Sequence, residues 1–207
     1  AYGVFRARKE GRIKLDDKVT ISEYAWKQEG SRMCVEVGNQ VSVENLIQGM
    51  IVQSGNDATV ALAEHVAGTE ATSVHMMNTY AKELGMTGSH FTTSPGMPDP
   101  EHYTTARDSA ILASALIREF PEYYRWYAQR EFTFNGITQQ NRNGLLWRDP
   151  SVDGVKTGHT ESAGYCLVAS AQREGMRLVS AVLGTESMRA REDANAQAHA
   201  HAHDHAD

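Results

Sequence analysis

Apolar residues recur every three to four positions in several segments of the chain, and this spacing predicts amphipathic helices. Residues 1–13 show the pattern with no capping residue ahead of it. Further helices are predicted at residues 46–51, 58–66, 72–84 and 105–116. Gly68 and Gly85 follow two of these segments in the place where a glycine commonly ends a helix. Thr105 and Asp108 form a capping-box pattern at the start of the last segment.

The pattern changes near residue 131 to short runs that are typical of strands. Asn135-Gly136 lies between two such runs and predicts a tight hairpin turn, because both residues tolerate positive φ angles. Residues 164–173 and 176–184 are nearly continuous apolar runs, and Glu174-Gly175 supplies a second hairpin turn. Such runs imply burial on both faces, so helices should cover this sheet on two sides. The predicted fold class is α+β, a helical block packed with an antiparallel β-sheet.

The last part of the chain has a different composition. Residues 192–207 are rich in Ala and His and carry no large apolar face, so we predict a solvated or disordered His-rich tail after a single domain over residues 1–191. Neutral imidazoles bind zinc, nickel or copper, which makes the alternating histidines a weak metal candidate: His199, His201, His203 and His205. Without folded surroundings these side chains would bind ions only adventitiously, so no metal site and no cofactor are predicted.

Composition and charge exclude several function classes. The 207 residues carry 20 Lys and Arg against 26 Asp and Glu, a net charge of −6, and they show no concentrated basic face. This balance argues against a nucleic-acid partner. No run of 18 apolar residues occurs, so no membrane span is predicted. Cys34 and Cys166 lie too far apart for a Cys-x-x-Cys motif, and their redox state is left open.

Two tripeptides point to a chemistry. Ser54-Gly55-Asn56 ends a predicted buried helix, and Lys156-Thr157-Gly158 begins a predicted strand. Taken alone, Ser54 and Asn56 could be a helix cap and a turn former, and Lys156 could be a solvated strand end. Their order and context match the Ser-x-Asn and Lys-Thr-Gly signatures of serine penicillin-recognising proteins.

Longer segments indicate which subfamily of these proteins the chain resembles. Residues 46–58, 132–137, 141–147 and 152–160 resemble low-molecular-mass D-alanyl-D-alanine carboxypeptidases nearly word for word, and the likeness extends from about Tyr2 to about Arg191. The resemblance implies the β-lactamase/transpeptidase-like fold and an acyl-serine hydrolase of peptidoglycan maturation. It also implies a periplasmic or cell-envelope location, a stem peptide ending in D-Ala-D-Ala as substrate, and β-lactams as inhibitors.

The resemblance also implies roles for individual residues. Ser54 would pass a proton toward the leaving nitrogen, Asn56 would hold the substrate's amide carbonyl, and Lys156 would hydrogen-bond Ser54 and keep the site electropositive. The remaining candidates would bind substrate, with carboxylate recognition by an arginine and a threonine and one oxyanion-hole N–H from a histidine: Gly55, Arg142, Thr157, Gly158 and His159. Arginine suits a carboxylate because its planar fork donates paired hydrogen bonds. An arginine between two asparagines could also be a plain surface residue.

The family's third signature, Ser-x-x-Lys, does not occur in the sequence. Alignment of residues 2–11 with the family's active-site helix places that tetrad a few residues before Ala1, so we expect this chain alone not to acylate. We also expect a sheet of three strands with an unpaired edge. A second departure is Thr93-Ser-Pro-Gly-Met97, where many relatives carry His-Gly. The alternatives are β-lactamase or esterase chemistry on the same scaffold, or an inactive scaffold that binds ligands or metals weakly.

Overall fold

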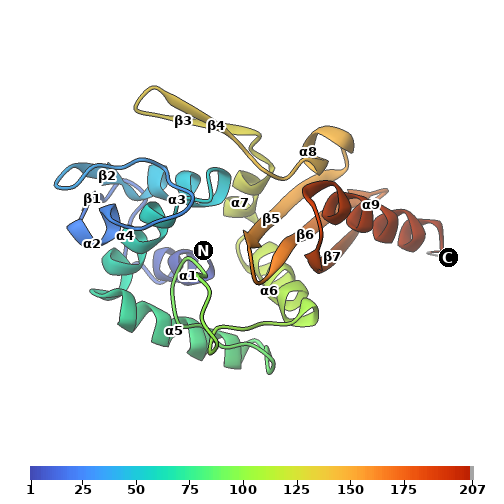
Figure 1. Cartoon of the computed structure of the whole chain (residues 1–207), viewed down its shortest axis with the longest axis horizontal. Helices are drawn as coiled ribbons and strands as arrows, with labels where there is room; N and C mark the ends of the chain where they lie inside the picture. The colour runs from blue at the N-terminus through green and yellow to red at the C-terminus, as the bar shows by residue number, and fades with distance from the viewer. Residues whose placement is uncertain (206–207) are drawn as a thin grey trace. The chain divides into compact units, whose positions relative to one another are not determined.

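The computed structural model describes residues 1–205, apart from the side chain of His203, and it divides into two compact units. The first unit comprises Ala1–Glu83, His90–His102 and Gln129–Asn141. The second comprises Leu84–Ser89, Tyr103–Ala128 and the chain from Arg142 onward. Figure 1 shows the elements of both units along the chain.

The first unit contains most of the predicted helices and two small antiparallel sheets. Its elements are α1 (Tyr2–Lys9), β1 (Lys18–Thr20), α2 (Glu23–Trp26), β2 (Gln40–Ser42), α3 (Val43–Val52), α4 (Asn56–Ala67), α5 (Glu70–Glu83), β3 (Glu131–Phe134) and β4 (Ile137–Gln140). Strand β1 pairs with β2, and β3 pairs with β4. Asn135 and Gly136 adopt φ angles of 50° and 75°, which confirms the predicted hairpin turn.

Local sequence accounts for where these helices begin and end. Ser42 caps α3, because its Oγ accepts a hydrogen bond from the Asn45 N–H at 3.1 Å. Gly68 ends α4 in the left-handed region, at φ 86°, as predicted. Helices α3 and α4 pack against each other around Leu46, Ile47 and Leu62, all of which are fully buried. This packing fixes the turn between α3 and α4, where the first tripeptide lies.

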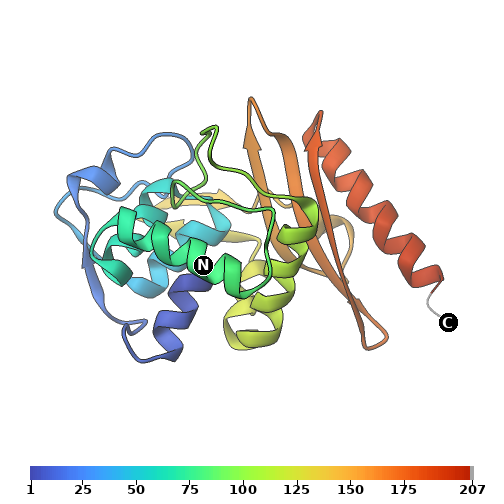
Figure 2. The ribbon, with the colours of Figure 1, turned by 90° about the horizontal axis from the view of Figure 1, so that it is seen from below.

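The second unit is a three-stranded antiparallel sheet with helices. Its elements are α6 (Ala106–Glu119), α7 (Pro121–Tyr124), the 3-10 helix η1 (Arg125–Ala128), α8 (Leu145–Arg148), β5 (Val152–Thr160), β6 (Gly164–Arg173), β7 (Met176–Thr185) and α9 (Met188–Asp204). The strand order is β5-β6-β7, so the prediction of three strands is confirmed for the described residues. Helices α6 and α9 cover opposite faces of this sheet, as predicted (Figure 2).

Turn and cap chemistry is confirmed here as well. The Oγ1 of Thr105 accepts a hydrogen bond from the Asp108 N–H at 3.0 Å and caps α6. Glu174 and Gly175 turn β6 into β7 with φ angles of 51° and 79°. Lys156 lies in the middle of β5 and not at its start, because the strand already begins at Val152.

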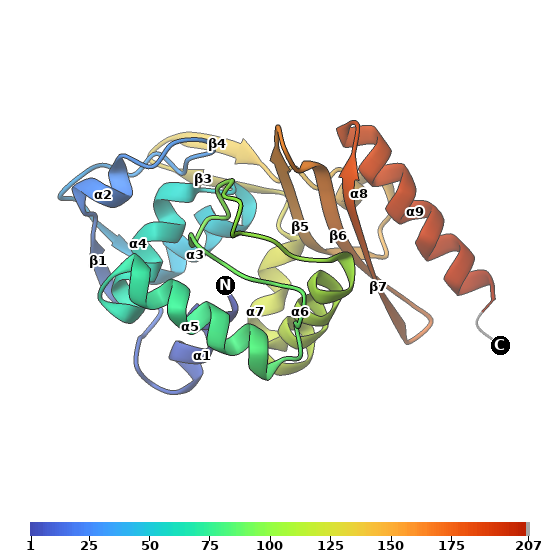
Figure 3. The ribbon, with the colours of Figure 1, turned by 60° about the horizontal axis from the view of Figure 1, so that its bottom comes forward.

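The prediction of a solvated or disordered tail is wrong for the residues that the structure describes. The chain continues as α9 to Asp204, and this helix packs along β6 and β7 (Figure 3). Three of its polar side chains, from Arg191, Asn195 and His199, are buried. Ser180 on β7 forms hydrogen bonds with Asn195 Oδ1 and His199 Nε2. The helix is therefore held by buried polar contacts that an apolar periodicity does not reveal.

Candidate functional site

Ser54 and Gly55 form the turn between α3 and α4. Ser54 adopts a φ of 51°, a left-handed conformation that is uncommon outside glycine, and is partly buried. The N–H groups of Gln53 and Gly55 both donate to the Gly49 carbonyl at 3.1 Å. A Cβ on Gly55 would lie 3.0 Å from the Met33 nitrogen, a closer approach than Cβ atoms normally make, so a side chain here would force a neighbour to shift. An unfavourable φ held by such packing is the kind of local strain that concentrates at functional sites.

Asn56 is the first residue of α4, and the chain on either side of the turn holds it. Its backbone N–H donates to the Ser31 carbonyl at 2.8 Å, and its Nδ2 donates to the Glu29 carbonyl at 2.6 Å. The same Nδ2 lies 3.6 Å from the thioether sulfur of Met97. A thioether is a weak acceptor. A peptide carbonyl could therefore replace Met97 as the second acceptor of this carboxamide.

The second tripeptide lies on β5, whose partner among the described residues is β6 alone. Lys156 is partly buried and its Nζ donates to the Thr157 carbonyl at 2.9 Å. Thr157 is buried, whereas Gly158 and His159 are exposed. The His159 ring stacks on Tyr165 with 3.9 Å between centroids, so its imidazole is engaged with the neighbouring strand.

Three cations act on one another in the second unit. Burial and, to a smaller extent, the positive charges of Arg142 and Arg191 together lower the pKa of Lys156 from 10.5 to about 8. Arg142 is exposed and follows the β3–β4 hairpin, between the buried Asn141 and Asn143. The three like charges of this cluster disfavour one another's charged forms, and Glu192 partly offsets this effect at Arg191.

Sequence reasoning missed Arg191 as a member of this cluster. It lies on α9, is 2% exposed, and its Nη1 donates to the Gly158 carbonyl at 3.4 Å. Its Nε has no hydrogen-bond partner among the described residues. Burial lowers the pKa of this guanidinium as well. No sequence signal distinguished Arg191 from Arg189, which is mostly exposed.

The predicted site residues fall into two groups. Ser54, Gly55 and Asn56 come together in the first unit, and Arg142 and the Lys156–His159 run come together in the second. Among the residues that the structure describes, no group of three or more side chains could hold a metal ion, and His199 is hydrogen-bonded to Ser180. Within the same residues, every helix is too short or too polar to cross a bilayer.

The family model for D-alanyl-D-alanine carboxypeptidases matches residues 1–187. The chain belongs to the D-alanyl-D-alanine carboxypeptidase family. It is 49% identical over 197 residues to D-alanyl-D-alanine carboxypeptidase DacA of Haemophilus influenzae, a match that covers 93% of this chain and 50% of that protein. The chain thus spans about half the length of this curated relative.

Solved structures of two penicillin-binding proteins share the fold of this chain. Penicillin binding protein 5 from Haemophilus influenzae aligns with a TM-score of 0.92 and 48% identity, over 95% of this chain and 58% of that one. Penicillin-Binding Protein D2 from Listeria monocytogenes, in its cefotaxime-bound form, aligns with a TM-score of 0.84 and 27% identity, over 95% of this chain and 80% of that one. The recognition of the family and the predicted fold class are therefore confirmed.

Proposed function

We propose that this chain is the substrate-binding and proton-transferring part of a serine-type D-Ala-D-Ala carboxypeptidase of the cell envelope. Its substrate would be a peptidoglycan stem peptide that ends in D-Ala-D-Ala, and β-lactams would inhibit it by imitating that terminus. The observation that carries the proposal is the cluster of Arg142, Lys156 and Arg191 beside the Lys-Thr-Gly strand. A peptide with a free C-terminal carboxylate is an anion that such a cluster would attract and hydrogen-bond.

The residues of the second unit would bind the end of the peptide. Strand β5 offers its open edge to an extended peptide, a common mode of peptide recognition. The Thr157 hydroxyl and the guanidinium groups of Arg142 and Arg191 would bind the terminal carboxylate. The backbone N–H of His159 would donate to the oxyanion of the tetrahedral intermediate. The engaged imidazole of His159 fits a role through its backbone.

The residues of the first unit would act on the scissile amide. The serine of a Ser-x-x-Lys tetrad, which this sequence lacks, would attack the carbonyl of the penultimate D-Ala. Ser54 would relay a proton to the departing nitrogen. The Asn56 Nδ2 would hold the substrate's amide carbonyl in place of Met97. Loss of D-Ala would leave an acyl-serine that water hydrolyses.

Labelling with a fluorescent penicillin tests this proposal. We compare the chain as given with an extended version, in which an upstream segment that carries Ser-x-x-Lys is fused before Ala1. We expect labelling of the extended version and none of the given chain. Labelling of neither would favour the inactive scaffold, and labelling of both would place the nucleophile elsewhere. Rapid release of the label would instead favour β-lactamase chemistry.

A further inference from the structure

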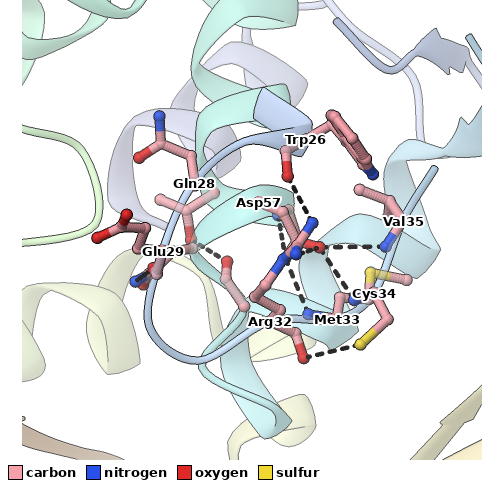
Figure 4. A network of polar contacts seen from close by, with 12 residues as sticks. Trp26, Gln28, Glu29, Arg32, Met33, Cys34, Val35 and Asp57 are labelled. Carbon is pink, nitrogen blue, oxygen red and sulfur yellow. Dashed lines mark hydrogen bonds and ion pairs between the residues drawn. The ribbon is translucent and has the colours of Figure 1, made fainter. Parts of the chain in front are cut away.

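Asp57 follows Asn56 in the chain, is fully buried, and has no role in the chemistry described above. Its Oδ1 accepts hydrogen bonds from the N–H groups of Met33 at 2.8 Å and Ala58 at 2.9 Å. Its Oδ2 accepts from Cys34 at 2.9 Å and Val35 at 3.1 Å. One carboxylate therefore binds three consecutive backbone N–H groups of a segment that lies far earlier in the sequence (Figure 4).

The bound segment, residues 29–35, has no helix or strand of its own. Cys34 within it adopts a φ of 71°, which turns consecutive N–H groups toward one anion. Arg32 supplies a positive charge, with its Nε 4.0 Å from Asp57 Oδ2, and donates to the Trp26 carbonyl. Hydrogen bonds to a charged acceptor are about twice as strong as neutral ones, so Asp57 is the main anchor of this segment.

The anchored segment in turn holds the Ser54-Gly55-Asn56 turn. The Glu29 carbonyl accepts from Asn56 Nδ2, and the Ser31 carbonyl accepts from the Asn56 N–H. Gly30, at φ 84°, lies so near that a Cβ there would be 2.7 Å from Asn56 Nδ2. Met33 packs against Gly55. The Asn56 carboxamide is thus oriented by backbone groups whose own position depends on the adjacent aspartate.

We propose that Asp57 is a positioning residue: its carboxylate fixes residues 29–35, and these residues orient the Asn56 carboxamide that would hold the substrate's amide carbonyl. The effect of Asp57 on catalysis rests on the proposed function. The dependence of the Asn56 orientation on Asp57 does not. Two experiments therefore separate them, one on the chain as given and one on the extended version.

Amide hydrogen exchange, measured by NMR on the chain as given, tests whether residues 29–35 and Asn56 both depend on Asp57. Cys34 is exposed, yet its N–H should be as protected as that of Asn56, because both depend on the same anchor. In Asp57→Asn, an NH2 group replaces one acceptor, and we expect exchange at residues 33–35 and at Asn56 to accelerate at least about tenfold. Acceleration at residues 33–35 alone would overturn the proposal. Should the variant not fold, a freely exchanging Cys34 amide in the wild-type chain would overturn it too.

Asp108→Asn is the matched control, since Asp108 is also a buried aspartate in the first turn of a helix. Its carboxylate binds the N–H of Gly88 and the hydroxyl of Ser89, neither of which is a candidate site residue. This variant should lose stability to a similar extent and leave exchange at Asn56 unchanged. Faster exchange at Asn56 in both variants would mean a general loss of stability and would overturn the assignment to Asp57.

A double-mutant cycle in the extended version tests the catalytic consequence through release of D-Ala. We expect Asp57→Asn to lower kcat/KM at least about tenfold, Asp108→Asn to change it less than about threefold, and Asp57→Asn to add little in an Asn56→Ala background. Additive losses, or a loss below threefold for Asp57→Asn, would refute action through Asn56. If the unsubstituted extended version released no D-Ala, the proposed function would fail, and amide exchange would still decide the coupling.

Discussion

Replacing Lys156 by methionine should stabilise the second unit against unfolding at neutral pH. The pKa of this ammonium group is about 8, against an ordinary 10.5, because burial and the charges of Arg142 and Arg191 disfavour its charged form. One pKa unit corresponds to about 1.4 kcal/mol, so the lowering of the pKa from 10.5 to about 8 means that the charged form costs the fold at most about 3.5 kcal/mol. Partial exposure and the lost bond to the Thr157 carbonyl reduce the expected net gain to about 1–2 kcal/mol.

The sign of the pH dependence follows from the two pKa values. Between pH 8 and 10.5 the unfolded chain binds more protons at Lys156 than the folded chain, so wild-type stability rises with pH in this window. Below pH 8 both states are protonated and the full penalty is present. The advantage of Lys156→Met should therefore be constant below about pH 8 and disappear by about pH 10.5.

Urea unfolding from pH 6 to pH 10.5 measures this difference. Lys82→Met, at an exposed position, serves as the control and should show no such loss of advantage across the window. A Lys156→Met variant that is less stable than wild type at pH 7, or whose advantage does not change with pH, would refute the reasoning. Greater stability of Lys156→Met, together with loss of D-Ala release when the same substitution is made in the extended version, would identify Lys156 as a residue kept for function at a cost to folding.

Three further outcomes are expected. Asn195→Ala should lower the free energy of unfolding by about 2–3 kcal/mol, because it removes the buried hydrogen bonds of Asn195 to β6, to β7 and within α9. The control Arg189→Ala, at an exposed position of the same helix, should be nearly neutral, and equal Tm values for both variants would contradict this prediction. Gly136→Ala should cost about 1 kcal/mol in urea unfolding, since its φ is 75°, and unchanged stability would speak against this turn. Arg142→Gln should raise the pKa of Lys156 toward 10.5 in an NMR titration, and an unchanged pKa would mean that the two charges do not interact.

The parts of the fold predicted from sequence are those that local chemistry decides. The spacing of apolar residues located α3, α4, α5 and α6, and the Thr105 cap placed the start of α6. The pairs Asn135-Gly136 and Glu174-Gly175 marked the turns of the two hairpins. Each of these signals acts within a few residues of its effect. The Lys-Thr-Gly motif likewise lies on a strand, as expected, and its cluster of cations agrees with carboxylate recognition.

The parts that were missed depend on contacts between distant segments. Helix α9 buries the side chains of Arg191, Asn195 and His199, which are spaced four residues apart. The face of α9 that contacts the sheet is therefore polar, and from the sequence it resembles a solvent-exposed face. Asp57 looks like an ordinary residue of a helix's first turn. Its role arises because three amides from residues 33–35 converge on it. Hydrogen bonds between residues so far apart in the chain produce no periodic pattern in the sequence.

Release of D-Ala from an acetylated tripeptide ending in D-Ala-D-Ala tests the central claim most directly, namely that Asn56 and Lys156 serve one carboxypeptidase reaction. The measurement compares the extended version with its Asn56→Ala, Lys156→Ala and doubly substituted forms. We predict release by the unsubstituted form, a loss of kcat/KM of at least about a hundredfold in each single variant, and a double variant scarcely worse than either. Release that survives both substitutions, or no release from the unsubstituted form, would contradict the account.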